Sequence, residues 1–312
     1  MKIAVFGYHN IGYECLKVLI DRSEEIVTVV THQDDPNEEI WFRSVAELAQ
    51  THHIPVHTPS SPNTPAFISL IRRLSPDLIL SFYYRRLLSK ELLAIPRWGG
   101  INLHGSLLPK YRGRSPVNWA LINGESETGV TLHHMTQKAD AGDIIAQRPV
   151  PIDMEDTALS LFHKLTAAAT QLLQETFPRI RAGTAPRIPQ DSRLATTFGG
   201  RRPEDGKITW ERPASAIHNL IRAVTHPYPG AFTFHLDRKL YLWNATLNHQ
   251  SSIVTKGPPG TIEAGETGRG ILISTGEGSL LVKRMQFGGE QEMSADELIK
   301  HHGIPVGTRL GP

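Results

Sequence analysis

Cysteine is almost missing from this sequence, and long apolar runs are missing altogether. Cys15 is the single cysteine among 312 residues, which excludes an internal disulfide framework and favours a cytoplasmic protein. It lies within a predicted helix, where a lone cysteine usually serves as a small buried apolar residue rather than as a reactive thiol. No apolar stretch approaches the roughly 18 residues of a membrane-spanning helix, so we expect no membrane insertion.

A strong excess of charge of one sign is also lacking. The formal net charge is +2 at pH 7, and the isoelectric point is near 8.6. From residue 201 onward there are 13 Lys and Arg against 11 Asp and Glu, and the first 200 residues contain 20 of each class. A protein that binds the phosphates of a long nucleic acid needs a cationic surface. We therefore expect no nucleic-acid partner.

Nucleotide-binding and metal-binding signatures are absent as well. In the N-terminal stretch "FGYHNIG", four residues separate Gly7 from Gly12 and no lysine follows, which matches neither the dinucleotide fingerprint nor the phosphate loop. We therefore expect no NAD. Histidines occur in adjacent pairs at 52–53, 133–134 and 301–302, but neighbours on a strand point to opposite faces. We therefore expect no metal.

What is present is a regular alternation of strand and helix patterns over the first part of the chain. Short apolar runs between turn residues predict buried strands, and apolar residues at helical spacing predict helices. The predicted strands are residues 2–8, 25–32, 54–59, 77–84, 99–105, 128–135 and 143–152, and the predicted helices are residues 11–22, 44–53, 66–76, 116–124 and 157–180. This alternation predicts an α/β fold with a Rossmann-like, mostly parallel sheet.

The pattern changes near residue 190. Residues 191–204 contain "FGG" and several arginines and are predicted to be a linker. A helix at 214–224 then precedes short strands at residues 230–236, 239–247, 260–264, 270–276 and 278–287, separated by glycine turns. This spacing predicts a small β-barrel or an open-faced β-domain. We expect two domains, residues 1–190 and residues 205–312.

The candidate chemistry begins in "INLHGSLLPKYRGRSPVNWALING", residues 101–124. Asn102 and His104 are two residues apart at the end of a predicted strand, so their side chains share a face. A neutral histidine can take a proton near pH 7, and an amide N–H can stabilise an oxygen that becomes negative. Acyl or formyl transfer to an amine needs both. The pair alone fits a hydrogen-bonded core histidine beside a structural asparagine even better.

A carboxylate suited to act on His104 occurs in "KADAGDII", residues 138–145. Near the ring, Asp140 would orient it and raise its pKa. Spacing does not decide whether the two meet, and Asp143 is the competing acid, although the start of a strand suits a cap or contact with water. Arg112 and Arg114 could hold an anion, although a short basic loop is more often a solvated surface.

These motifs together resemble the 10-formyltetrahydrofolate-dependent formyltransferases, which carry an N-x-H pair, an S-L-L-P loop and a later aspartate. Within that family, "LSFYYRRLLS" and "LPKYRGRSPVNW" are similar to the UDP-4-amino-4-deoxy-L-arabinose formyltransferases of lipid A modification and polymyxin resistance. The resemblance covers nearly the whole chain. It implies a Rossmann-like catalytic domain followed by a small barrel similar to an OB fold, with 10-formyltetrahydrofolate as co-substrate and neither metal nor NAD.

The resemblance also implies a role for each matching residue. Asn102 would polarise the formyl oxygen, His104 would carry the proton exchanged between the attacking amine and N10 of the folate, and Asp140 would raise the pKa of His104. The implied folate-binding residues are Arg86, Leu87, Leu88, Arg114, Thr136, Gln137, Lys138 and Ala139. The sequence departs from those sugar enzymes at Ser115, where they have alanine, and at Arg86.

Three other activities remain as alternatives. Methionyl-tRNA formyltransferase has the same chemistry, but the even charge balance argues against a tRNA substrate. An N-formyltransferase acting on a dTDP-linked or GDP-linked amino sugar is the second alternative, although the predicted C-terminal barrel and "RGRSPVNW" favour the UDP-linked arabinose. A folate-binding protein or a 10-formyltetrahydrofolate hydrolase would lack the amine acceptor, which an assay with the folate alone would reveal.

Overall fold

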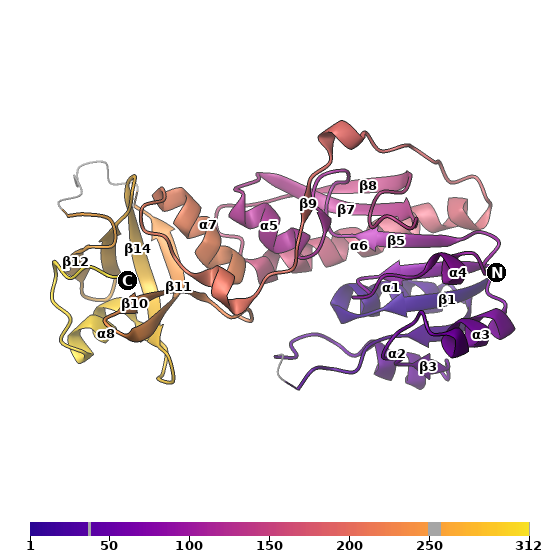
Figure 1. The fold of residues 1–312 in the computed structure, drawn as a ribbon, viewed down its shortest axis with the longest axis horizontal. Coiled ribbons are helices and arrows are strands. Elements are labelled where there is room, and N and C mark those ends of the chain that lie inside the picture. The colour runs from indigo at the N-terminus through magenta and orange to yellow at the C-terminus, as the bar shows by residue number, and fades with distance from the viewer. Residues whose placement is uncertain (37–38, 249–256, 312) are drawn as a thin grey trace. The chain divides into compact units, whose positions relative to one another are not determined.

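The computed structural model describes residues 1–36, 39–248 and 257–311, and these form two compact units (Figure 1). The first unit contains Met1–Pro116, Glu127–Pro151 and Phe162–Gly199. The second contains Val117–Ser126, Ile152–Leu161 and Gly200–Pro312. Two short segments that precede residue 162 therefore belong by their contacts to the second unit.

The first unit is built on a seven-stranded sheet with the order β3-β2-β1-β4-β5-β7-β8. Its strands are β1 (Lys2–Gly7), β2 (Glu25–Val30), β3 (Val56–His57), β4 (Leu78–Phe82), β5 (Gly100–His104), β7 (Glu127–His134) and β8 (Ile144–Pro151). The pairings from β3 to β5 are parallel, whereas β7 runs antiparallel to both β5 and β8. All five residues of β4 are buried, including the polar Ser81, as expected for a central strand of a sheet covered on both faces.

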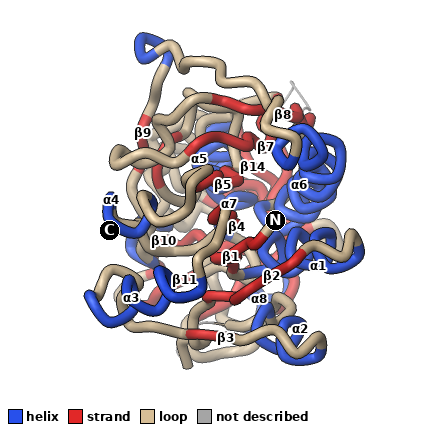
Figure 2. Tube along the Cα trace, turned by 90° about the vertical axis from the view of Figure 1, so that its right-hand side faces the viewer, coloured by secondary structure: helices blue, strands red, loops and turns tan. Residues whose placement is uncertain are grey.

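Helices cover both faces of this sheet. They are α1 (His9–Asp21), α2 (Val45–Thr51), α3 (Pro65–Leu74), α4 (Lys90–Leu93) and, from residue 162 onward, α6 (Ala158–Arg181). Figure 2 shows α1 and α6 on one side of the strands and α3 and α4 on the other. On the second side, Phe67 and Ile71 of α3 and Leu92 of α4 join a buried cluster with Phe6 and Ile79 of the sheet.

Polar side chains begin three of these helices. The hydroxyl groups of Ser44, Thr64 and Ser89 each accept a hydrogen bond from the backbone N–H three residues further on. Such caps satisfy amides that the helix itself leaves without partners. The helix starts of α2, α3 and α4 are therefore set by local sequence.

The second unit contains an antiparallel sheet with the order β10-β11-β14-β13-β12, and β15 pairs with β14. Its strands are β10 (Ala231–His235), β11 (Arg238–Leu247), β12 (Ile262–Glu266), β13 (Gly270–Ser274), β14 (Ser279–Phe287) and β15 (Met293–Ser294). Its helices are α5 (Pro116–Ile122, which this unit includes from Val117 on), η2 (Pro203–Gly206), α7 (Ala214–Val224) and α8 (Ala295–His301). The predicted fold class, a mostly parallel α/β domain followed by a β domain, is confirmed.

The segment predicted to be a linker contains regular structure. Residues 191–204 include η1 (Ser192–Leu194) and β9 (Thr197–Phe198). Strand β9 pairs in parallel with β6 (Arg112–Gly113), which lies in the loop after β5. In the part of the chain that the structure describes, no helix combines the length and the apolarity needed to cross a membrane.

A buried threonine holds the loop that follows His104. Thr131 lies opposite His104 in the β5–β7 pairing, and its side chain is fully buried. The hydroxyl donates to the carbonyl of Ser106 at 2.6 Å and accepts from the backbone N–H of Leu108 at 3.1 Å and from the amide of Gln147 at 2.9 Å. One hydroxyl therefore satisfies a backbone carbonyl and a backbone N–H of the buried residues Ser106 and Leu108, and it also bonds to the exposed side chain of Gln147.

We predict that Thr131→Val lowers the free energy of unfolding by about 1–3 kcal/mol, because the isosteric side chain leaves the buried N–H of Leu108 without its acceptor and the carbonyl of Ser106 without its donor. Urea denaturation followed by circular dichroism measures the change. The control is Thr170→Val on the outer part of α6, where the hydroxyl bonds only to the carbonyl of Ala167 and the expected change is within about 0.5 kcal/mol. Equal effects of the two substitutions would contradict the assigned role.

Candidate functional site

The end of strand β5 carries the polar pair that the sequence singled out. Strand alternation places the side chains of Asn102 and His104 on one face of the sheet, and the pairing with β7 sets His133 opposite Asn102. His104 is only 8% exposed. Asp140, from the turn between β7 and β8, reaches the same place, with its Oδ1 atom 3.6 Å from Nδ1 of His104 and 3.5 Å from Nδ2 of Asn102.

The ring of His104 is held by a backbone carbonyl on its other side. Its Nε2 atom lies 2.7 Å from the carbonyl oxygen of Tyr111. Because a carbonyl oxygen can only accept, Nε2 carries the proton and donates it to this bond. In the neutral ring the lone pair is then on Nδ1, the atom that faces Asp140. The nitrogen that can take a further proton is therefore the one beside the carboxylate.

Burial and charge act on His104 in opposite directions. Burial lowers its pKa, and this effect outweighs the charge of Asp140 and the carbonyl of Tyr111, both of which raise it. The sequence prediction that Asp140 raises the pKa has the right sign for that contribution, but the net pKa lies below its ordinary value because the ring is buried. His104 is therefore neutral near pH 7 and available as a base.

Asp140 is ionised in this environment. Burial alone would raise its pKa, but the neighbouring His104 and His133 and the backbone N–H of Gly113 bring it below its usual range. The N–H of Gly113 donates to Oδ2 at 2.9 Å. Asp140 also has a left-handed backbone with φ of 50°, a conformation that costs non-glycine residues energy and is common at functional sites.

His133 belongs to the same cluster, although from the sequence it was considered only as a metal ligand. Its Nδ1–H donates to the carbonyl of His134 at 2.9 Å, so Nε2 is the acceptor, 3.1 Å from Nδ2 of Asn102 and 3.5 Å from Oδ1 of Asp140. This fixes which end of the Asn102 amide faces the carboxylate. Only the strand pairing reveals this neighbour, since 31 residues separate the two in sequence.

The competing acid and the two arginines of the basic loop occupy different surroundings. Asp143 makes an ion pair with Arg187 at 3.4 Å, and its side chain is 37% exposed. Arg112 is buried and donates twice to the side chain of Gln190, whereas Arg114 is exposed. Of the two arginines predicted to hold an anion, Arg114 is therefore exposed to solvent, whereas the guanidinium of Arg112 is buried and bonded to Gln190.

The predicted folate residues lie on separate segments. In the segment after β4, Arg86 and Leu87 are exposed, Leu88 is buried in the cluster with α3, and the carbonyl of Leu87 accepts a hydrogen bond from Asn63 at 2.9 Å. The other segment, residues 136–139, directly precedes Asp140 and is exposed. Its first residue, Thr136, donates its hydroxyl to the carbonyl of Lys138 at 2.9 Å.

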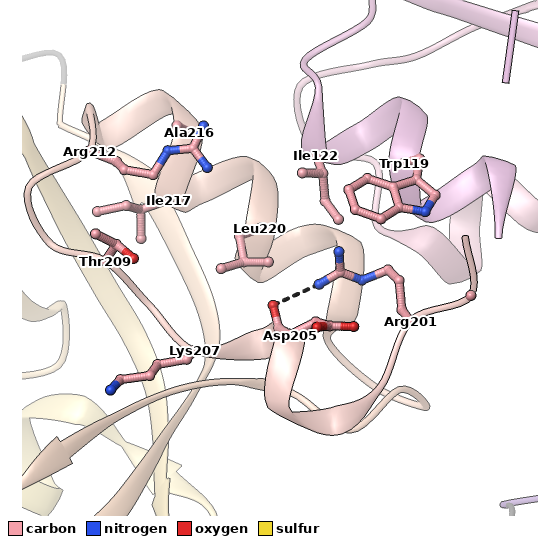
Figure 3. A pocket seen from close by; sticks show the side chains of 11 residues that line it. Trp119, Ile122, Arg201, Asp205, Lys207, Thr209, Arg212, Ala216, Ile217 and Leu220 are labelled. Carbon is pink, nitrogen blue, oxygen red and sulfur yellow. Dashed lines mark hydrogen bonds between the residues drawn. The ribbon is translucent and has the colours of Figure 1, made fainter. Parts of the chain in front are cut away.

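The second unit has a cavity of about 420 Å³ that contains none of the predicted site residues (Figure 3). Arg201 crosses it, with its guanidinium 4.8 Å from the centre of the Trp119 ring and bonded to the backbone carbonyl of Asp205 at 2.8 Å. Its lining includes Ile217 and Leu220 of α7. No histidine or cysteine is among the lining residues, so this cavity offers no group that exchanges protons near pH 7.

Comparison with known families covers most of the chain. Residues 1–177 match the family model described as formyl transferase. Residues 201–303 match the model described as formyl transferase, C-terminal domain. The first match contains Asn102, His104, His133 and Asp140.

Several solved structures have a similar fold. An N-formyltransferase from Helicobacter canadensis, in complex with folinic acid and dTDP-3-aminofucose, is 22% identical, with 94% of this chain and 100% of that chain covered and a TM-score of 0.71. HypX from Aquifex aeolicus, in complex with tetrahydrofolic acid, is 19% identical over 98% of this chain, with a TM-score of 0.66, and the chain spans 48% of its length. A methionyl-tRNA formyltransferase from Clostridium thermocellum is 18% identical, with 80% and 95% covered and a TM-score of 0.57.

We predict that Asp140→Asn lowers the pKa of His104 still further, because it removes the negative charge that favours the protonated ring. Titration of ¹⁵N-labelled histidines by NMR from about pH 4 to pH 8 measures it, with His104→Gln to assign the signal. Asp143→Asn is the matched control, since that carboxylate pairs with Arg187 and its loss should leave His104 unchanged. A rise in the pKa of His104 on Asp140→Asn would overturn the assignment.

Proposed function

Because the chain belongs to the formyl transferase family, it is a formyltransferase, and we propose that it transfers a formyl group from 10-formyltetrahydrofolate to the amine of a nucleotide-linked amino sugar. The observation that carries the proposal is the meeting of Asn102, His104 and Asp140 within 3.6 Å at the end of β5. Asn102 and His104 come from strand β5, and Asp140 comes from the turn between β7 and β8. Each has a chemical property that formyl transfer to nitrogen uses.

His104 acts as the proton carrier. An amine attacks the formyl carbon only when it is neutral, so a proton must leave it as the new carbon–nitrogen bond forms. The neutral ring takes this proton on Nδ1, and the ionised carboxylate of Asp140, 3.6 Å away, stabilises the cation. The proton then passes to N10 of the folate as the old carbon–nitrogen bond breaks, which returns His104 to its neutral form.

Asn102 supplies a hydrogen bond to the formyl oxygen. One N–H of its side chain faces His133 at 3.1 Å. The second faces Asp140 at 3.5 Å, which is too long for a strong hydrogen bond. That second N–H is the one free to donate to the oxygen as negative charge develops on it. A single positioned donor of this kind typically contributes about 10²–10³ in kcat.

UDP-4-amino-4-deoxy-L-arabinose is the acceptor that the sequence motifs favour. The stretches "LSFYYRRLLS" and "LPKYRGRSPVNW" are similar to enzymes for that sugar, which would place this chain in lipid A modification. The Helicobacter canadensis enzyme, in complex with folinic acid and a dTDP-linked amino sugar, supports the wider class of acceptor. An enzyme for another dTDP-linked or GDP-linked amino sugar is the nearest alternative.

A tRNA acceptor is the second alternative, since a methionyl-tRNA formyltransferase shares the fold over 80% of this chain. The equal numbers of acidic and basic residues in the first 200 positions, and an excess of two basic residues afterwards, disfavour it. A strong salt-dependent attraction to phosphates would need a larger excess of cations. We therefore place the nucleotide sugar first.

An acceptor panel tests the proposed substrate. With 10-formyltetrahydrofolate as donor, we expect formylation of UDP-4-amino-4-deoxy-L-arabinose to be fastest among UDP-, dTDP- and GDP-linked amino sugars and initiator methionyl-tRNA, as followed by mass spectrometry. Faster formylation of another nucleotide sugar would contradict the proposed acceptor but keep the proposed class of acceptor. Faster formylation of the tRNA would contradict the proposal that the acceptor is a nucleotide-linked amino sugar. Release of formate at the same rate without any amine would indicate a hydrolase.

Substitution of the proton carrier tests the mechanism. We predict that His104→Ala and Asp140→Ala each lower kcat by at least about 10²-fold while circular dichroism shows a folded protein, because a positioned acid–base group typically contributes 10²–10⁴-fold. His52→Ala, on an exposed histidine after α2, is the control and should keep wild-type turnover. Turnover near the wild-type rate by either site variant would exclude the mechanism.

A further inference from the structure

The side chain of Gln190 connects the two loops that form the candidate site. Its Nε2 donates to the backbone carbonyl of Asp140 at 2.9 Å and to that of Gly142 at 2.7 Å. Its Oε1 accepts from Nε and Nη2 of Arg112 at 3.1 and 2.6 Å. Both ends of one amide are therefore used, one by the turn that carries Asp140 and one by the loop that follows His104.

The orientation of this amide is set by its partners. Backbone carbonyls can only accept hydrogen bonds and a guanidinium can only donate them, so the NH₂ group of Gln190 must face the turn and its oxygen must face Arg112. Arg112 is 5% exposed, and its guanidinium donates two hydrogen bonds to the side-chain oxygen of Gln190. Gln190 is thus the group that satisfies this buried cation.

Gly113 completes a closed circuit of hydrogen bonds. It follows Arg112 directly and donates its N–H to Oδ2 of Asp140 at 2.9 Å. Asp140 is therefore held at its side chain by Gly113 and at its backbone by Gln190. Gln190 in turn accepts two hydrogen bonds from Arg112. The left-handed backbone of Asp140 is a conformation that persists only where surrounding contacts enforce it, and these contacts meet that need.

Gln190 itself is fixed by pairing on both sides. Ile188 forms a β-bridge with Ile144. On the other side, Thr196 accepts from the backbone N–H of Arg112 at 2.9 Å through its carbonyl and from that of Tyr111 at 2.8 Å through its hydroxyl. The segment around Gln190 is therefore joined to the start of β8 and to the loop after β5 by bonds that do not involve the Gln190 side chain.

We propose that Gln190 is a positioning residue, which holds the turn of Asp140 so that the carboxylate stays against the ring of His104. The proposal rests on the proposed function for its kinetic consequences, but its structural core concerns only these residues. The side chain of Gln190 bonds to Arg112 and to the backbone of Asp140 and Gly142, and not to the ring of His104 or the amide of Asn102. It acts through the placement of Asp140, and displacement of a catalytic group by about 1 Å can cost 10²-fold in rate.

Two substitutions separate this role from a simple anchor for Arg112. Gln190→Leu removes both functions of the amide, whereas Gln190→Glu keeps an oxygen for Arg112 and loses the N–H donors to the turn. We expect both variants to lower kcat by about 10- to 100-fold, with Gln190→Glu at least as stable to heat as Gln190→Leu because of its ion pair with Arg112. Wild-type kcat in Gln190→Glu would overturn the proposal.

A double substitution shows whether the effect passes through Asp140. In the Asp140→Asn background, Gln190→Leu should lower kcat by less than about 3-fold further, because the carboxylate it positions is already gone. A loss as large as in the wild-type background would overturn the proposal. The control is Gln171→Leu, on an exposed glutamine of α6, which should leave kcat unchanged in both backgrounds.

NMR titration of His104 tests the inference without any substrate. Gln190→Leu should move the pKa of His104 downward, in the same direction as Asp140→Asn, because the carboxylate that favours the protonated ring is displaced. If the wild-type enzyme transfers no formyl group, the proposed function fails while this titration still decides the role of Gln190. An unchanged pKa in Gln190→Leu would overturn the positioning role even if transfer is observed.

Discussion

The arrangement of the loops around the candidate site depends on the contact between the carboxylate of Asp140 and the ring of His104. A carboxylate with only 14% of its side chain exposed must receive hydrogen bonds or it loses its charge. The N–H of Gly113 donates to it at 2.9 Å and the amide of Asn102 faces it at 3.5 Å, while the rings of His104 and His133 lie beside it at 3.6 and 3.5 Å. Their arrangement forces the loop after β5, the end of β7 and the turn before β8 to meet at one point.

Two opposing effects set the proton affinity of His104. Burial alone favours the neutral ring, and the carboxylate alone favours the cation. Burial dominates in the free protein, which leaves Nδ1 open to take a proton. Once the proton arrives, it lies beside Asp140 and is stabilised there. The same pair therefore suits both halves of a transfer in which a proton is taken from one nitrogen and given to another.

The reversal of strand direction at β7 is what brings the second histidine to the site. If β7 ran parallel to β5, His133 would not lie opposite Asn102 in the register that pairs them. The antiparallel pairing also makes β7 end beside the start of β5, where His134 pairs with Ile101, and the turn that follows carries Asp140 to His104. Residues 188–198 then connect this turn to the loop after β5 through Ile188, Gln190 and β9. A segment with the composition of a linker thus supports the site.

The sequence by itself determined the α/β class and the resemblance to the family, and it predicted a helix from Ser44, because apolar periodicity and motif spacing are properties of neighbouring residues. It also placed Asn102 and His104 on one face, since alternation along a strand is local. Only the tertiary structure decided that Asp140 rather than Asp143 reaches His104, that His133 and Gln190 join them, and that Arg112 is buried. These contacts span 27 to 78 residues of sequence, and they depend on strand register and loop closure, which no local pattern encodes.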